Sequence, residues 1–198
     1  MLVTKQAPDF TATAVLADGQ IVEGFKLSEN YGEKGTVLFF YPLDFTFVCP
    51  SEIIAFSHKV EEFKQRGVNV IGVSVDSQFS HFAWRETPVN EGGIGRVNMP
   101  LVADLTKEIS KSYDVLLDGG VALRGSFLID ADGTIRHAVI NDLPLGRNID
   151  EMVRMVDTML YTNEHGEVCP AGWVKGDEAM KPTTEGVAEY LDKHAQEL

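Results

Sequence analysis

Cysteine is scarce in this chain: Cys49 and Cys169 are the only two, and they lie far apart in the sequence. Neither belongs to a Cys-x-x-Cys pair, which argues against a structural zinc site. Two cysteines in 198 residues also exclude a disulfide-stapled miniprotein. The plain alternative to a reactive role is that both side chains are small buried hydrophobes.

Basic residues and long apolar runs are also few. Lys and Arg total 17 against 30 Asp and Glu, a formal charge of −13. Nucleic acid and anionic membrane surfaces both require a basic footprint, so neither is an expected partner. No run approaches the roughly 18 apolar residues that span a bilayer, and residues 1–9 contain no apolar signal segment. We therefore expect a cytoplasmic protein.

The remaining composition is that of a globular protein, with 44% hydrophobic and 24% charged residues. Asp18-Gly19 between two extended runs predicts a hairpin, and the apolar run at 36–41 predicts a buried central strand. The other expected strands are at 68–75, 101–103, 126–130 and 134–139, and the expected helices are at 51–66, 78–86, 106–113, 149–160 and 186–195.

This order of elements predicts an α/β protein with a mostly parallel central sheet and antiparallel strands at one side. It is the pattern of a thioredoxin-like fold with an N-terminal β-hairpin and a C-terminal extension. More than half of the net negative charge lies in residues 150–198, which Gly and Pro interrupt repeatedly. We expect a folded domain at 1–160 and a C-terminal arm at 161–198 that lies over a surface.

Cys49 stands where chemistry is expected in such a fold. It follows the strand at 36–41 and a short loop, and it precedes a helix. Pro50 suits the first helical position, so we expect Cys49 at the N-cap. Free N–H groups and the positive end of the helix dipole favour a thiolate there. Glu52 occupies the place where a dithiol oxidoreductase would carry its second cysteine, so the chemistry has to end at another thiol, and Cys169 is the only one.

Four segments resemble one known family. The segment Tyr41-Pro42-Leu43-Asp44-Phe45-Thr46-Phe47-Val48-Cys49-Pro50-Ser51-Glu52 strongly resembles the peroxiredoxin active site. Residues 123–130 are similar to the strand that bears the family's arginine, and residues 141–147 to the segment that bears the second arginine. His165-Gly166-Glu167-Val168-Cys169-Pro170 resembles the resolving-cysteine segment of typical two-cysteine peroxiredoxins, the alkyl hydroperoxide reductase C type.

The resemblance implies a thiol peroxidase that reduces hydrogen peroxide and organic hydroperoxides through a cysteine sulfenic acid, without a metal or organic cofactor. It implies five catalytic residues, Cys49, Cys169, Thr46, Arg124 and Pro42, and two residues that orient Arg124, Glu52 and Arg147. Complete ionisation of a thiol raises its reactive fraction only roughly 30-fold. Most of the rate must therefore come from donors aimed at the peroxide oxygens.

The family also implies an assembly. Cys169 would come from the other subunit of an antiparallel homodimer, dimers would associate into a decamer, and thioredoxin or a dedicated flavoprotein would reduce the disulfide. An oligomeric holdase chaperone with secondary thiol chemistry is the alternative from another functional class. A cysteine hydrolase is a further alternative, although none of the five histidines lies in a hydrolase signature.

Two further segments bear on over-oxidation of Cys49. Gly92-Gly93-Ile94-Gly95 resembles the glycine-rich loop of the family's peroxide-sensitive members. Those members pair it with Tyr-Phe in a C-terminal helix, where this chain has Tyr190-Leu191. Because Leu191 lacks a ring, the helix should cover the active site less firmly, and we expect intermediate sensitivity.

Overall fold

The computed structural model describes residues 1–196 and divides the chain into two compact units, Met1–Ile149 and Asp150–Leu198. The expected boundary at 160–161 stays a prediction, and the end of the expected arm, 197–198, lies outside the described residues.

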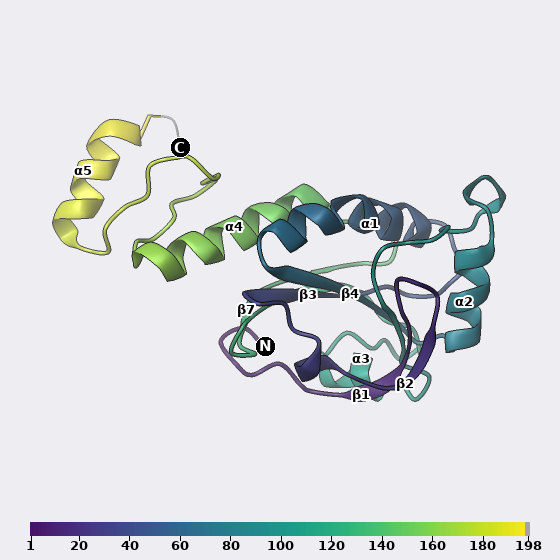
Figure 1. Ribbon diagram of the computed structural model, residues 1–198. Helices are drawn as coiled ribbons and strands as arrows, with labels where there is room; N and C mark the ends of the chain where they lie inside the picture. The colour runs from purple at the N-terminus through teal and green to yellow at the C-terminus, as the bar shows by residue number, and fades with distance from the viewer. Residues whose placement is uncertain (197–198) are drawn as a thin grey trace. The chain divides into compact units, whose positions relative to one another are not determined.

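A seven-stranded sheet organises the first unit, in the order β2-β1-β5-β4-β3-β6-β7. Figure 1 shows helix α1 on one side of strands β3 and β4 and helix α3 on the other. Its strands are β1 Thr11–Val15, β2 Ile21–Lys26, β3 Gly35–Phe40, β4 Val68–Ser74, β5 Leu101–Ala103, β6 Arg124–Asp130 and β7 Ile135–Asn141. The helices are α1 Cys49–Gln65, α2 Gln78–Glu86, α3 Glu108–Ser112, α4 Ile149–His165 and α5 Thr184–His194, with short 3-10 turns η1 Leu27–Glu29 and η2 Val89–Glu91.

The α/β class is confirmed, but the expected strand directions are wrong in part. Only β3–β4 and β4–β5 are parallel pairs, and the other pairings are antiparallel. The N-terminal hairpin joins the same sheet through β1 and β5, so antiparallel strands lie at both edges rather than one. Local patterns identify a strand, but the choice of its neighbour depends on pairing between distant segments.

Strand β3 is the buried centre that its apolar sequence predicts, with every residue buried. On one face Phe39 stacks on Phe56 of α1, with ring centroids 4.2 Å apart. On the other face Phe40 contacts Tyr113 and Phe127 at 5.1 Å and 5.8 Å. Burial on both faces explains why the strand has no polar alternation.

The strand directions bring three segments that are distant in sequence to the end of the sheet where β3 finishes. The chain leaves β3 at Phe40 and reaches Cys49 through a short loop. Because β6 is antiparallel to β3, its first residue, Arg124, lies beside the end of β3. Strand β7 is antiparallel to β6 and pairs Asn141 with Arg124, so the segment that follows β7 begins at the same end of the sheet.

Helix α1 begins at Cys49, which corrects the expected N-cap position. Val48 is the N-cap and has helical torsion angles, φ −85° and ψ −35°. Its carbonyl accepts from the N–H of Ser51 at 3.1 Å, so Cys49 is already in the first turn. The sequence pointed to the proline as the start, but the loop enters the helix one residue earlier.

The second unit contains most of helix α4, a long connecting segment and helix α5. Helix α4 runs to His165, five residues beyond its expected end at 160. An isolated bridge pairs Val168 with Met180, at 2.9 Å and 3.0 Å. Trp173 is buried, and its Nε1 donates to the Asp177 carbonyl at 3.2 Å. Thr183 caps α5 by accepting from the N–H of Gly186 at 3.0 Å.

Candidate active site

The Cys49 sulfur is fully buried and lies between two donors. Thr46 Oγ1 is 3.0 Å from it, and Arg124 Nη1 is 3.4 Å from it. Thr46 Oγ1 also lies 2.8 Å from the Leu43 carbonyl. A hydroxyl has one hydrogen, so it donates to either the carbonyl or the sulfur at a given moment. The Thr46 hydroxyl can therefore turn its hydrogen from the Leu43 carbonyl to the sulfur when negative charge develops there.

The loop before Cys49 holds Thr46 in this position by an unusual backbone turn. Phe45 has a φ of 54°, a left-handed conformation that aromatic residues rarely adopt. On its N-terminal side, the N–H of Asp44 donates to Asp76 Oδ2 at 2.8 Å. The Phe45 ring lies 5.6 Å from that of Trp84 on α2. These contacts hold the loop in the shape that points the threonine back at the sulfur.

Glu52, one turn into α1, joins the two arginines. Its Oε2 accepts from Arg124 Nη1 at 2.7 Å and from Arg147 Nη2 at 2.9 Å. Its Oε1 accepts from the backbone N–H and the Nε of Arg147, both at 2.9 Å. Arg124 Nε donates to the Leu143 carbonyl at 2.7 Å. The guanidinium of Arg124, which lies beside Cys49, is therefore held through both Nη1 and Nε.

Arg147 fills the space behind this pair. Its Nη1 donates to the carbonyls of Phe40 and Gly125, at 2.9 Å and 2.8 Å, and to Ser126 Oγ at 3.1 Å. Its guanidinium also lies over the Phe39 ring, 5.3 Å from the centroid. Two strand ends and α1 are thus joined through one side chain.

Burial and charge oppose each other in this cluster. Burial alone would raise the pKa of Glu52, but the hydrogen bonds and positive charges of Arg147 and Arg124 outweigh it and hold that pKa below its usual value. Burial lowers the pKa of Arg147, and Glu52 partly offsets the effect. Two cations and one anion leave a buried net charge of about +1, which an anionic Cys49 sulfur would balance.

Sequence reasoning missed a buried polar cluster beside the loop. His81 Nδ1 lies 2.8 Å from Asp44 Oδ2, and His81 Nε2 lies 3.2 Å from the Val102 carbonyl. Tyr41 donates to Asp44 Oδ1 at 2.9 Å. Burial and the negative charge of Asp44 raise the pKa of Tyr41. The cluster ties the loop to α2 and β5, and no local motif announces it because its members come from separate segments.

Pro42 is buried two residues after the end of β3, and its shielding role stays a prediction. Cys169 lies in the second unit as a half-buried free thiol. The hydrolase alternative finds no support, because the hydrogen-bonding neighbours of Cys49 in the described chain are Thr46 and Arg124 rather than an imidazole.

Residues 1–196 show neither a cluster suited to a metal ion nor a helix suited to span a membrane. No group of three or more His, Cys, Asp or Glu side chains there is arranged to hold a metal ion. No helix of the described chain is long and apolar enough to cross a membrane.

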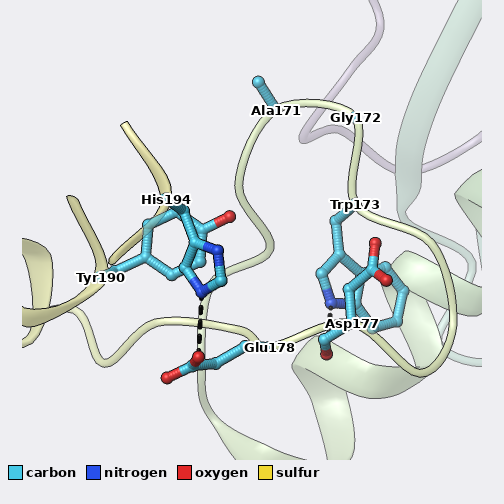
Figure 2. Close-up of a pocket in the computed structure, with 7 residues that line it drawn as sticks. All are labelled: Ala171, Gly172, Trp173, Asp177, Glu178, Tyr190 and His194. Carbon is cyan, nitrogen blue, oxygen red and sulfur yellow. Dashed lines mark hydrogen bonds and ion pairs between the residues drawn. The ribbon is translucent and has the colours of Figure 1, made fainter. Parts of the chain in front are cut away.

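The second unit has a pocket of about 490 Å³ beside α5, shown in Figure 2. Glu178 on its wall accepts from Lys193 at 2.7 Å and pairs with His194 at 3.0 Å. The ring of Tyr190 is buried and lies 4.6 Å from that of His194, whereas Leu191 is exposed. The charged groups on this wall fasten α5 to the preceding loop.

Comparison with known proteins gives consistent matches over the chain. The AhpC/TSA family matches residues 3–138, and the C-terminal domain of 1-Cys peroxiredoxin matches residues 159–193. Alkyl hydroperoxide reductase C of Helicobacter pylori (strain ATCC 700392 / 26695) is 62% identical over all of both chains. Peroxiredoxin-2 of Mus musculus is 57% identical over 97% of this chain and 96% of its own. The reduced 2-Cys peroxiredoxin of Plasmodium vivax superposes with a TM-score of 0.94, at 47% identity over 98% of this chain and all of that one.

Proposed function

The chain belongs to the AhpC/TSA family of peroxiredoxins, with their thioredoxin-like fold, and we propose that it reduces hydroperoxides at Cys49 and resolves the oxidised sulfur with Cys169 of a second subunit. The protein is a peroxidase, and its relatives carry the names alkyl hydroperoxide reductase C and peroxiredoxin-2. The observation that carries the assignment of Cys49 is its burial between Thr46 Oγ1 and Arg124 Nη1.

In the first step the Cys49 sulfur attacks one oxygen of the hydroperoxide. A sulfur–oxygen bond forms as the O–O bond breaks, the sulfur is oxidised to a sulfenic acid, and the departing oxygen takes a proton and leaves as an alcohol or as water. Donors fixed before the reaction stabilise the charge that develops on the two oxygens. Thr46 and Arg124 supply these donors, and Glu52 and Arg147 keep Arg124 oriented.

In the second step Cys169 of the partner subunit forms a disulfide with Cys49. Both cysteines are free thiols in this structure. Strand β7 supports pairing with a second copy, because it is an edge strand whose Val139 and Ile140 are exposed by 36% and 45%. An exposed apolar edge strand favours addition of another strand. An antiparallel homodimer formed there is our proposal for the functional unit.

Association of dimers into a decamer is a further part of the proposal. Phe45, Phe79 and Phe82 are exposed by 54%, 69% and 41% on the loop and α2. Exposed aromatic side chains of this kind are typical of surfaces that a partner covers. We propose that a thioredoxin-type or flavoprotein reductant then reduces the disulfide, and that the protein works in the cytoplasm, where thiols are kept reduced.

Non-reducing electrophoresis after one equivalent of peroxide tests this function. We expect a covalent dimer in the wild type, a monomer in Cys169→Ser, and no reaction with peroxide in Cys49→Ser. An oxidised wild type that stays monomeric would exclude the intersubunit disulfide. A Cys49→Ser variant that still consumes peroxide at the normal rate would exclude Cys49 as the reacting thiol.

A further inference from the structure

Residues of its own subunit contact Cys169. Arg154, Thr158 and Thr162 follow one another at four-residue spacing, so they form one stripe along α4. Arg154 Nη1 donates to the Trp173 carbonyl at 2.8 Å, which holds the segment after Cys169 against that stripe. The Val168–Met180 bridge holds the residue before it. These contacts hold the chain on both sides of Cys169 beside the stripe.

Two groups of the stripe lie next to the Cys169 sulfur. Thr162 Oγ1 is 3.7 Å away, and the Thr158 carbonyl, which can accept the S–H hydrogen, is 4.0 Å away. A threonine inside a helix commonly returns its hydroxyl to the carbonyl four residues earlier, and Thr158 does this with Arg154 at 2.9 Å. Thr162 differs, because its hydroxyl lies against the sulfur.

The last turn of a helix is an unfavourable place for an anion, since its free carbonyls carry partial negative charge. Tyr161, hydrogen-bonded to Glu167 at 2.8 Å, adds no positive charge. Arg154 supplies a positive charge on this side, and its guanidinium donates to Glu151 at 2.6 Å and 2.7 Å. Those hydrogen bonds raise the pKa of Arg154, and the charge of Cys169 adds to the effect.

We propose that Thr162 is a catalytic residue of the resolving step, in which its hydroxyl donates to the Cys169 sulfur as that thiol loses its proton. This rests on the proposed role of Cys169. The thiolate attacks the sulfenic sulfur of Cys49, a sulfur–sulfur bond forms, and the S–O bond breaks. The hydroxide that leaves takes up a proton, so a thiol and a sulfenic acid give a disulfide and one water. Because the hydroxyl bonds the anionic sulfur more strongly than the thiol, it promotes the reacting form.

The test compares Thr162→Val with Thr158→Val. Both replace a hydroxyl by a methyl on the same face of α4, but only the first hydroxyl lies against the sulfur. After a single peroxide pulse, rapid alkylation and mass spectrometry follow the sulfenic acid on Cys49 and then the disulfide. We expect Thr162→Val to slow disulfide formation by about fivefold to tenfold, the range of one hydrogen bond. Thr158→Val should stay within about twofold, and Thr162→Ser should restore the rate.

Two internal measurements separate this role from a loss of structure. The rate of sulfenic acid formation at Cys49 reports the folded active site in the same sample, and it should not change. The second measurement is rescue by Thr162→Ser, because serine returns a hydroxyl to the same position beside the sulfur. A wild-type rate in Thr162→Val, an equal loss in Thr158→Val, or no rescue by Thr162→Ser would each overturn the proposal. If instead the wild type forms no Cys49–Cys169 disulfide, the proposed function fails rather than the role of Thr162.

Discussion

Glu52→Gln should destabilise the protein and slow its reaction with peroxide. The substitution keeps the size of the side chain and one carbonyl oxygen. At the position of Oε2, however, an NH2 group would face Arg124 Nη1 and Arg147 Nη2, which now donate at 2.7 Å and 2.9 Å. Both arginines and Glu52 are almost fully buried, with side-chain exposures of 2–4%. Water therefore cannot replace the lost acceptor.

The magnitude follows from these contacts. Two hydrogen bonds between charged groups are lost, each contributing about 1.5–3 kcal/mol. Removal of one member of a buried ion pair typically costs about 3–5 kcal/mol, because it leaves a charge uncompensated. We therefore expect the free energy of unfolding to fall by about 3–5 kcal/mol. The peroxide reaction should slow by about tenfold to a hundredfold, since Arg124 loses its orientation.

Urea unfolding at a fixed protein concentration measures the first effect, and single-turnover oxidation of Cys49 measures the second. Glu62→Gln is the matched control, because Glu62 lies in the same helix in a half-exposed pair with Lys59 at 2.8 Å. Such surface pairs contribute less than about 1 kcal/mol. If Glu52→Gln loses no more stability than Glu62→Gln, the three-residue cluster does not stabilise the fold as we reason.

The same variant has a pH signature. The native pKa of Glu52 lies below its unfolded value, so the native state binds fewer protons and the carboxylate stabilises the fold. This contribution is complete above the unfolded pKa of about 4.3 and is lost as the pH falls through the lower native pKa. The gap in stability between wild type and Glu52→Gln should therefore narrow below about pH 4. A gap that widens on acidification would contradict the assigned shift.

Three further predictions concern activity. Arg124→Lys should reduce the rate of Cys49 oxidation about a hundredfold, because an ammonium cannot reach the sulfur and the Leu143 carbonyl at once. A near-normal rate would show that Arg124 does not act on the reacting sulfur. Thr46→Val should lose about a hundredfold in the same assay while Thr46→Ser stays within a few-fold, and equal losses would show that the hydroxyl is not what matters. Deletion of 190–198, of which 197–198 lie outside the described residues, should reduce sulfinic acid on Cys49 at matched turnover by mass spectrometry, whereas equal sulfinic acid would exclude a covering role for α5.

The chain's local patterns were enough to predict most elements and to place Cys49 at the start of the helix that follows β3. The spacing of apolar residues and the positions of turn residues predicted α2 and β5 with the bounds that the structure has. The motif around Cys49 pointed to Thr46, and the segments similar to the family pointed to Arg124, Arg147 and Glu52. These signals are short-range, or they are long enough to be recognised within one stretch of chain.

Tertiary structure alone decided which of these segments meet. Arg124 faces Cys49 because β6 runs antiparallel to β3, and no local pattern encodes that pairing. The same holds for the N-terminal hairpin, because β1 pairs with β5 from a distant part of the chain. The buried pair of Asp44 with His81 was invisible for the same reason, since a loop and a helix supply one member each. Sequence specified the chemical groups because they follow from residue type and neighbours, whereas their distances depend on packing among segments far apart in the chain.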